Sequence, residues 1–344
     1  MSQESYDDQR INWGMGVFPR ARRYTLKELL SNEAYLTDPE ASLFQGAIQN
    51  FFDRAENSRR EGNLNEAEKR LQLAQRLVGE RPEVDYIKQL DNADVLHCLG
   101  LLETARGNYR DAKKYLEDAL GLYQEVGNVE ESVSYVDYSL GELLRLQARL
   151  GDANHYFETA LEAVESLQKN VAQAVIHTSV GALHYEREDH KKAIEHLERA
   201  MKIDQPTNIG YDKLITYAYL QLARSRERLP MPVQPLRELI RAAEHTLQTN
   251  EWAGRLNLLF ADLLLTQNNP KYTQEALEVA TRTEEHAKRL GYLGVEADAL
   301  AYRAIAGKRL GTVGVEEMAL QSNGFYQREE VVSGLATRLQ NEVL

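Results

Sequence analysis

A three-part pattern recurs through the middle of this chain at a nearly constant interval. A large apolar residue and a glycine are followed, after a short break, by alanine, a large apolar residue and a second alanine. The alanines recur with periods of 41 and 40 residues, an interval typical of stacked supersecondary units. The copies are Leu99-Gly100 with Ala112, Leu116 and Ala119, then Leu140-Gly141 with Ala153, Phe157 and Ala160, then Val180-Gly181 with Ala193, Leu197 and Ala200.

Each copy predicts two antiparallel helices joined by a tight turn. The last three positions are spaced i, i+4 and i+7, which places them on one face of a helix. The glycine in the first helix has no side chain, so a neighbouring helix can approach it closely. Turn-forming pairs stand between the two halves, Gly107-Asn108 in one copy and Gly151-Asp152 in the next.

This combination of positions resembles the tetratricopeptide repeat, in a long-period form of about 40 residues. Weaker copies on both sides extend the resemblance over residues 39–320, as six or seven helical hairpins. The resemblance implies an all-α fold, a right-handed α-α superhelical solenoid. An apolar stripe near the end, including Leu335, Leu339 and Val343, predicts a C-terminal capping helix over residues 321–344.

Residues 1–38 do not fit the repeat and are expected to form an N-terminal arm with a short helix. Thr25 and Glu28 form a capping box for that helix, and Asp38-Pro39 marks the start of the next one. The arm contains Trp13 among apolar and basic residues, which favours docking, whereas its polar composition favours a solvated tail. Both interpretations stay open, and so does a homo-oligomer formed through this arm or the C-terminal helix.

Composition restricts the class of partner. The net charge of −12 argues against nucleic acid, because phosphate binding depends on Lys and Arg. No stretch approaches the ~20 apolar residues of a membrane helix, and no signal peptide is apparent. Cys98 is the single cysteine, which rules out a disulfide framework within the chain and favours a small buried side chain. We therefore expect a cytoplasmic protein whose partner is another protein or a peptide.

No catalytic, cofactor-binding or metal-binding motif stands out in the sequence, so we expect a non-enzyme. The densest group of possible ligands is a set of histidines in the third copy. Metal ligands converge on one point, whereas the repeat frame places one histidine in a turn and turns His196 away from the alanine face. Metal binding is therefore not expected at His177, His184, His190 and His196.

The resemblance also implies where a partner would bind, because the first helix of each hairpin lines the concave side in this family. Neither the polar clamp for a terminal carboxylate nor the asparagine ladder known in the family is present. Aromatic and arginine side chains remain, and these residue types dominate binding hot spots. The expected protein- or peptide-binding residues are Tyr135, Tyr138, Glu142, Arg145, Tyr185, Tyr217 and Arg224.

Three functions stay open at this point. The first is a scaffold or adaptor that holds a protein segment in its concave groove. The second is a regulatory solenoid that senses a peptide or metabolite and acts on a separate output protein. The third, an enzyme or its accessory subunit, would need a converging polar cluster that the sequence does not show.

Overall fold

The computed structural model describes residues 39–80, 85–127, 129–203, 211–227, 237, 251–267 and 269–344. The expected N-terminal arm, including Trp13, lies outside the described residues. So does the second half of the hairpin that begins with Leu222-Ala223, apart from residue 237.

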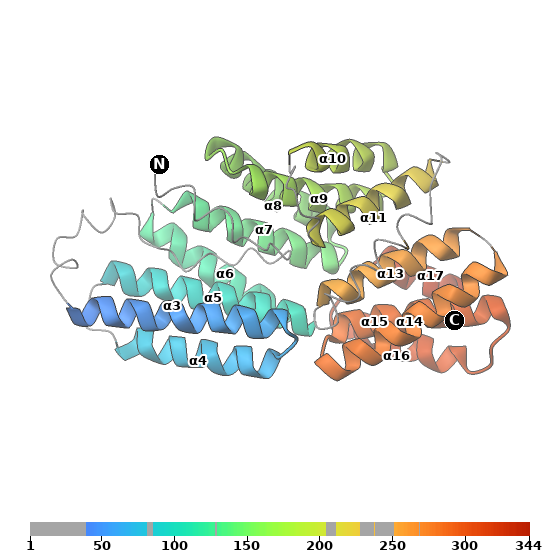
Figure 1. The fold of residues 1–344 in the computed structure, drawn as a ribbon, viewed down its shortest axis with the longest axis horizontal. Helices are drawn as coiled ribbons and strands as arrows, with labels where there is room; N and C mark the ends of the chain where they lie inside the picture. Colours follow the sequence, from blue (N-terminus) through green and yellow to red (C-terminus); the bar gives the residue numbers. More distant parts are fainter. Residues whose placement is uncertain are drawn as a thin grey trace.

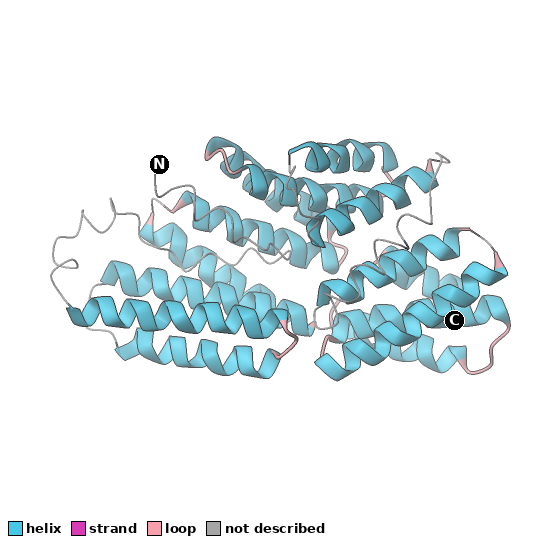
Figure 2. Ribbon diagram, viewed as in Figure 1, coloured by secondary structure: helices cyan, strands magenta, loops and turns pink. Residues whose placement is uncertain are grey.

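Successive helices of the described part pair as antiparallel hairpins, and Figure 2 shows only helices and loops there. The expected all-α solenoid of tetratricopeptide-like hairpins is confirmed. The first four pairs are α3 (Pro39–Arg60) with α4 (Leu64–Glu80), α5 (Asp85–Arg106) with α6 (Tyr109–Val126), α7 (Glu130–Leu146) with α8 (Leu150–Ser166), and α9 (Asn170–Glu186) with α10 (His190–Ile203). After α11 (Tyr211–Arg226), the chain continues with α13 (Glu251–Thr266), α14 (Pro270–Leu290), α15 (Leu293–Leu310), α16 (Val315–Arg328) and α17 (Gly334–Glu342).

The repeated glycines lie where two helices of a hairpin cross most closely. A Cβ atom added at Gly141 would lie 2.6 Å from the ring of Phe157, and one added at Gly181 would lie 2.5 Å from Leu197. The partner residues are themselves fully buried, as are the alanines that flank them. The recurring pattern is therefore the packing contact within each hairpin.

The turns also recur, but not wholly where the sequence predicts them. The left-handed residue of the turn is Gly107 in one hairpin, and at the matching positions Ala148 and Glu188 in the next two. The turn expected at Gly151-Asp152 is wrong, because Gly151 lies in the first turn of α8. In that hairpin the left-handed residue is Ala148, so the position of glycine does not predict the position of the turn.

The solenoid curves until its two ends meet. In Figure 1 helices α13–α17 lie beside α3–α6, and α7–α11 lie above both. One apolar core joins the two ends, since Tyr292 and Val295 pack in the same cluster as Ile48 and Leu102. The hydroxyl of Tyr292 donates to the backbone oxygen of Arg59 at 3.4 Å.

The last hairpin runs past residue 320, because α16 continues to Arg328 and packs on α15. The short α17 follows it and also packs on α15. Leu339 is completely buried there, and Ser333 caps the helix by accepting from the backbone N–H of Ala336 at 3.0 Å. The final helix thus returns across the inner side of the solenoid, where it helps to line a cavity.

Candidate functional site

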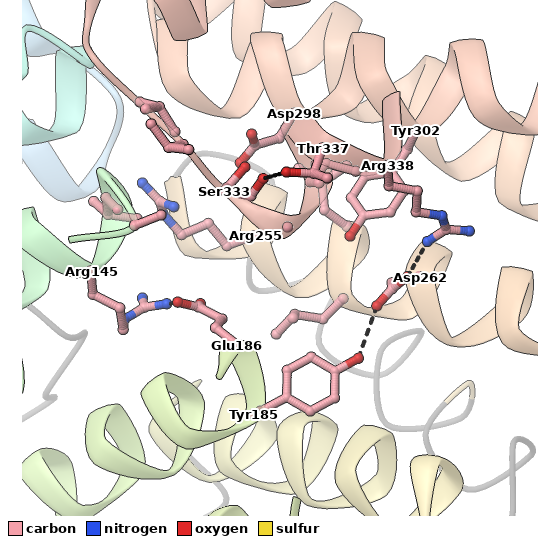
Figure 3. A pocket seen from close by; sticks show the side chains of 18 of the residues that line it. Arg145, Tyr185, Glu186, Arg255, Asp262, Asp298, Tyr302, Ser333, Thr337 and Arg338 are labelled. Atoms are coloured by element: carbon pink, nitrogen blue, oxygen red, sulfur yellow. Dashed lines mark hydrogen bonds and ion pairs between the residues drawn. The ribbon is translucent and has the colours of Figure 1, made fainter. Parts of the chain in front are cut away.

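A cavity of about 1020 Å³ lies between the inner surfaces of the middle and C-terminal hairpins. Its wall is formed by α7, α9 and α11 on one side and by α13, α15 and α17 on the other. Figure 3 shows side chains from α7, α9, α13, α15 and α17 around this space. The curvature of the solenoid therefore brings residues more than 150 positions apart to one site, as with Arg145 and Arg338.

One wall carries a buried ion-pair network centred on Arg145. Its guanidinium donates to Glu142 at 3.0 Å and forms a second ion pair with Glu186. It also lies 3.4 Å from the hydroxyl of Tyr219, to which it donates. Burial raises the pKa of Glu186, whereas for Glu142 burial is outweighed by the charge and hydrogen bonds of Arg145, so that its pKa lies below the ordinary value.

The opposite wall carries Asp262 of α13, which joins three elements. Its carboxylate accepts hydrogen bonds from the hydroxyl of Tyr185 at 3.1 Å and from the guanidinium of Arg338 at 2.8 Å. These two contacts are the dashed lines that meet at Asp262 in Figure 3. Arg338 also pairs with Glu342 at 2.7 Å, and Glu342 pairs with Arg309 at 3.0 Å. Helix α17 is thus held over the cavity by charged contacts in addition to Leu339.

A third carboxylate, Asp298 of α15, accepts a hydrogen bond from the hydroxyl of Tyr326 at 2.8 Å. Its burial raises its pKa, although the positive charges of Arg255 and Arg145 act in the opposite direction. The cavity therefore presents both arginines and carboxylates together with tyrosine rings. Such a wall can bind a ligand that offers both donors and acceptors.

The structure brings some of the expected binding residues to this cavity and places others elsewhere. Arg145 and Tyr185 line the cavity. Glu142 does not line it but forms an ion pair with Arg145. Tyr138 is buried against Phe157, with ring centroids 6.1 Å apart, and Tyr135 donates its hydroxyl to Glu131 on the same helix. Tyr217 is half-buried against the core, and Arg224 pairs with Glu198 of α10 at 3.0 Å. The expectation that all seven form a binding surface stays a prediction.

Several residues of the cavity are not among the seven expected binding residues. The repeat frame places Arg255 and Asp262 at inward positions, and both line the cavity. Tyr219 and Arg338 gave no such signal, because one lies outside the frame positions and the other lies beyond the last repeat. The residues that line the cavity and were not expected include Tyr219, Arg226, Arg255, Asp262, Asp298, Tyr302 and Arg338.

One histidine is placed differently from the expectation. His196 was expected to face away from the alanine face of its helix, but it lies against α9: its Nδ1 lies 3.1 Å from Nδ1 of His177, and its ring stacks on that of His184 with centroids 5.5 Å apart. His190 instead contacts the ring of Tyr185. In the described residues, no group of three or more His, Cys, Asp or Glu side chains is arranged to hold a metal ion.

Two further expectations can be checked. Cys98 is buried, and burial raises the pKa of its thiol well above the ordinary value, which agrees with a packing role. None of the described helices combines the length and apolar character needed to cross a bilayer.

Comparison with known families decides the nature of the repeats. A model of the tetratricopeptide repeat matches residues 91–166 and 132–206. The repeats within residues 91–206 are tetratricopeptide repeats. The matched stretches contain the three copies in which the sequence pattern is strongest, from Leu99-Gly100 to Ala200.

Solved structures with similar tetratricopeptide folds span most of the chain. The Rap protein complexed with competence and sporulation factor has a TM-score of 0.60 at 13% identity, with 92% of this chain and 89% of that chain covered. The Rap conjugation gene regulator of plasmid pLS20, in complex with the Phr* peptide, has a TM-score of 0.57 at 11% identity, with 85% and 76% covered. Apo RapI has a TM-score of 0.54 at 13% identity, with 86% and 98% covered. At these identities the likeness shows the fold alone, and curated protein sequences gave no match to this chain.

Proposed function

We propose that this protein is a non-enzymatic cytoplasmic regulator that binds a short peptide in its inner cavity and acts on a separate output protein. The observation that carries the proposal is the cavity itself, in which Arg145, Tyr185, Asp262 and Arg338 meet from four helices. An open solenoid would offer a continuous groove, whereas here α17 and the C-terminal hairpins face the middle hairpins across the space.

The size and chemistry of the cavity favour a peptide over a single metabolite. A volume of about 1020 Å³ is at the upper end of the ~300–1,000 Å³ range of small-molecule pockets. A peptide backbone supplies donors and acceptors at every residue, which matches a wall that carries both guanidinium and carboxylate groups. Tyrosine and arginine are also the residue types that most often anchor a bound segment.

The similar structures support the same class of ligand. Two of them are complexes, one with competence and sporulation factor and one with the Phr* peptide. Those ligands belong to those proteins. Their relevance here is that a tetratricopeptide solenoid of this overall arrangement accommodates a peptide.

A second candidate is an adaptor that holds a longer protein segment. The observation that favours it is the position of Tyr217 and Arg224, which are partly exposed on α11 but do not line the cavity. A bound segment that contacts both Tyr217 and Arg224 would extend beyond the cavity.

The test uses a phage-displayed library of random heptapeptides, selected on the full chain and then synthesised with a fluorophore for anisotropy titration. We expect micromolar or tighter binding that weakens at least tenfold in Asp262→Ala and in Tyr185→Ala, with Arg224→Ala as the matched surface control. Far-ultraviolet circular dichroism checks that each variant keeps its helices. Loss of binding in Arg224→Ala without loss in the other two would favour the adaptor, and equal binding by all variants would reject both candidates.

A further inference from the structure

Two imidazoles of the fourth hairpin lie close together between its two helices. His177 of α9 and His196 of α10 approach through their Nδ1 atoms, which lie 3.1 Å apart. Their ring centroids are 5.2 Å apart with an interplanar angle of 53°. Neither ring lines the cavity, so the pair has no part in the function proposed above.

The separation of the two nitrogens suits a shared metal ion. Zinc binds imidazole nitrogen at ~2.0–2.1 Å, so two adjacent ligand atoms of a tetrahedral site lie about 3.3 Å apart. The two Nδ1 atoms therefore need to move apart by only a few tenths of an ångström. In the absence of a metal, one Nδ1–H donates to the other Nδ1, and moving that proton to Nε2 of the same ring leaves both Nδ1 lone pairs available.

The surroundings hold both rings in place. His177 is buried, and the ring of His184 stacks on His196 at an interplanar angle of 25°.

Charged side chains lie around the cluster of His177, His184 and His196. Arg199 and Lys192 of α10 act on it from its own hairpin. Asp189 in the turn and Glu158 of α8 act on the adjacent His184, and Asp189 lies 3.9 Å from its Nδ1. The charged side chains that act on the two ligands themselves are positive, and the adjacent His184 feels the positive Lys192 and Arg187 together with the two carboxylates. The proposed site therefore rests on the geometry of the two nitrogens and not on the local field.

We propose that His177 and His196 form a two-histidine site for a borderline divalent transition metal, with Zn²⁺, Cu²⁺ and Ni²⁺ as the suitable ions. Imidazole ligands favour these ions over Mg²⁺ and Ca²⁺. Because the described residues provide no third ligand in place, water completes the coordination. The metal ties α10 to α9, the helix that carries Tyr185 and Glu186 into the cavity.

The test titrates the chelator-treated full chain with Zn²⁺ alone at pH 7.5 by isothermal calorimetry. We expect one site of micromolar affinity that weakens at least tenfold in His177→Gln and in His196→Gln. His155→Gln is the matched control, because His155 is an exposed histidine on α8, and it should bind as the unmodified chain does.

A second measurement keeps the proposal testable if a variant folds poorly. Electron paramagnetic resonance of one equivalent of Cu²⁺ on the unmodified chain should show hyperfine coupling to two imidazole nitrogens. Absence of binding below 100 µM, equal binding by the two variants and the control, or a copper spectrum without imidazole coupling would overturn the site.

Discussion

Glu329 accepts a hydrogen bond from the backbone N–H of Tyr109 at 3.1 Å, although 220 residues separate them in the chain. Tyr109 is the first residue of α6, so a carboxylate from the C-terminal hairpin caps this helix. The backbone of the same segment is held by Gln147, whose side-chain amide donates to the carbonyl of Glu329 at 3.1 Å and whose carbonyl accepts from Val332 at 3.3 Å. The C-terminal segment is therefore joined to the second and third hairpins by specific polar contacts.

This relationship predicts that Glu329→Ala destabilises the fold by about 1–2 kcal/mol, the usual cost of losing a helix cap and a buried hydrogen bond to a charged group. The neighbouring Glu330 is the matched control. It pairs with Arg110 across the same contact, but both side chains are about two-thirds exposed. Glu330→Ala should therefore change stability by less than about 0.5 kcal/mol. Urea unfolding followed by circular dichroism measures both, and equal effects would show that Glu329 does not act as a cap.

The helix crossings predict opposite effects for two glycine substitutions. Gly141→Ala should destabilise by about 1–3 kcal/mol, because its Cβ would lie 2.6 Å from Phe157 in a filled core. Gly121→Ala in α6 should stabilise by about 0.5–1 kcal/mol, since nothing lies within 4 Å of its added Cβ and alanine favours the helix. Thermal unfolding of both variants gives the two signs. The same sign in both would mean that Gly141 is not at a close crossing.

Asp137 predicts a pH-dependent stability. It is only 5% exposed on α7, and burial raises its pKa to about 6, partly offset by His155. The folded chain therefore holds a proton that the unfolded chain releases between about pH 4 and pH 6, so this group lowers stability as pH rises through that window. Asp137→Asn should then stabilise by about 1–3 kcal/mol at pH 7.5 and by much less at pH 4. A stabilisation independent of pH would contradict the shifted pKa.

The sequence was sufficient for the hairpins and insufficient for the cavity, for a physical reason. Gly141, Phe157 and the flanking alanines contact within one hairpin, so their spacing is visible as a local period. Glu329 and Tyr109, or Arg338 and Asp262, meet only because the solenoid curves through many repeats, and small changes of packing accumulate along that path. No local pattern encodes such a meeting.

The histidines show the same limit at shorter range. Residue spacing correctly places His177 and His184 on one helix. The expectation for His196 was different in kind, because it required knowing which side of α10 faces α9. The alanine face of α10 packs inward, and His196 lies at its border, close enough to contact both rings. A frame that divides a helix into inner and outer faces does not resolve such border positions.

Photo-crosslinking tests most directly whether the cavity is the peptide site. A peptide selected by display, with one residue replaced by benzoylphenylalanine, is irradiated with the full chain and the adducts are located by mass spectrometry. The account predicts adducts on segments that line the cavity, around Tyr185 of α9, Asp262 of α13, Tyr302 of α15 or Arg338 of α17. Adducts confined to the exposed faces of α6, α8 and α10, around Lys114, Thr159 or Glu195, would contradict it.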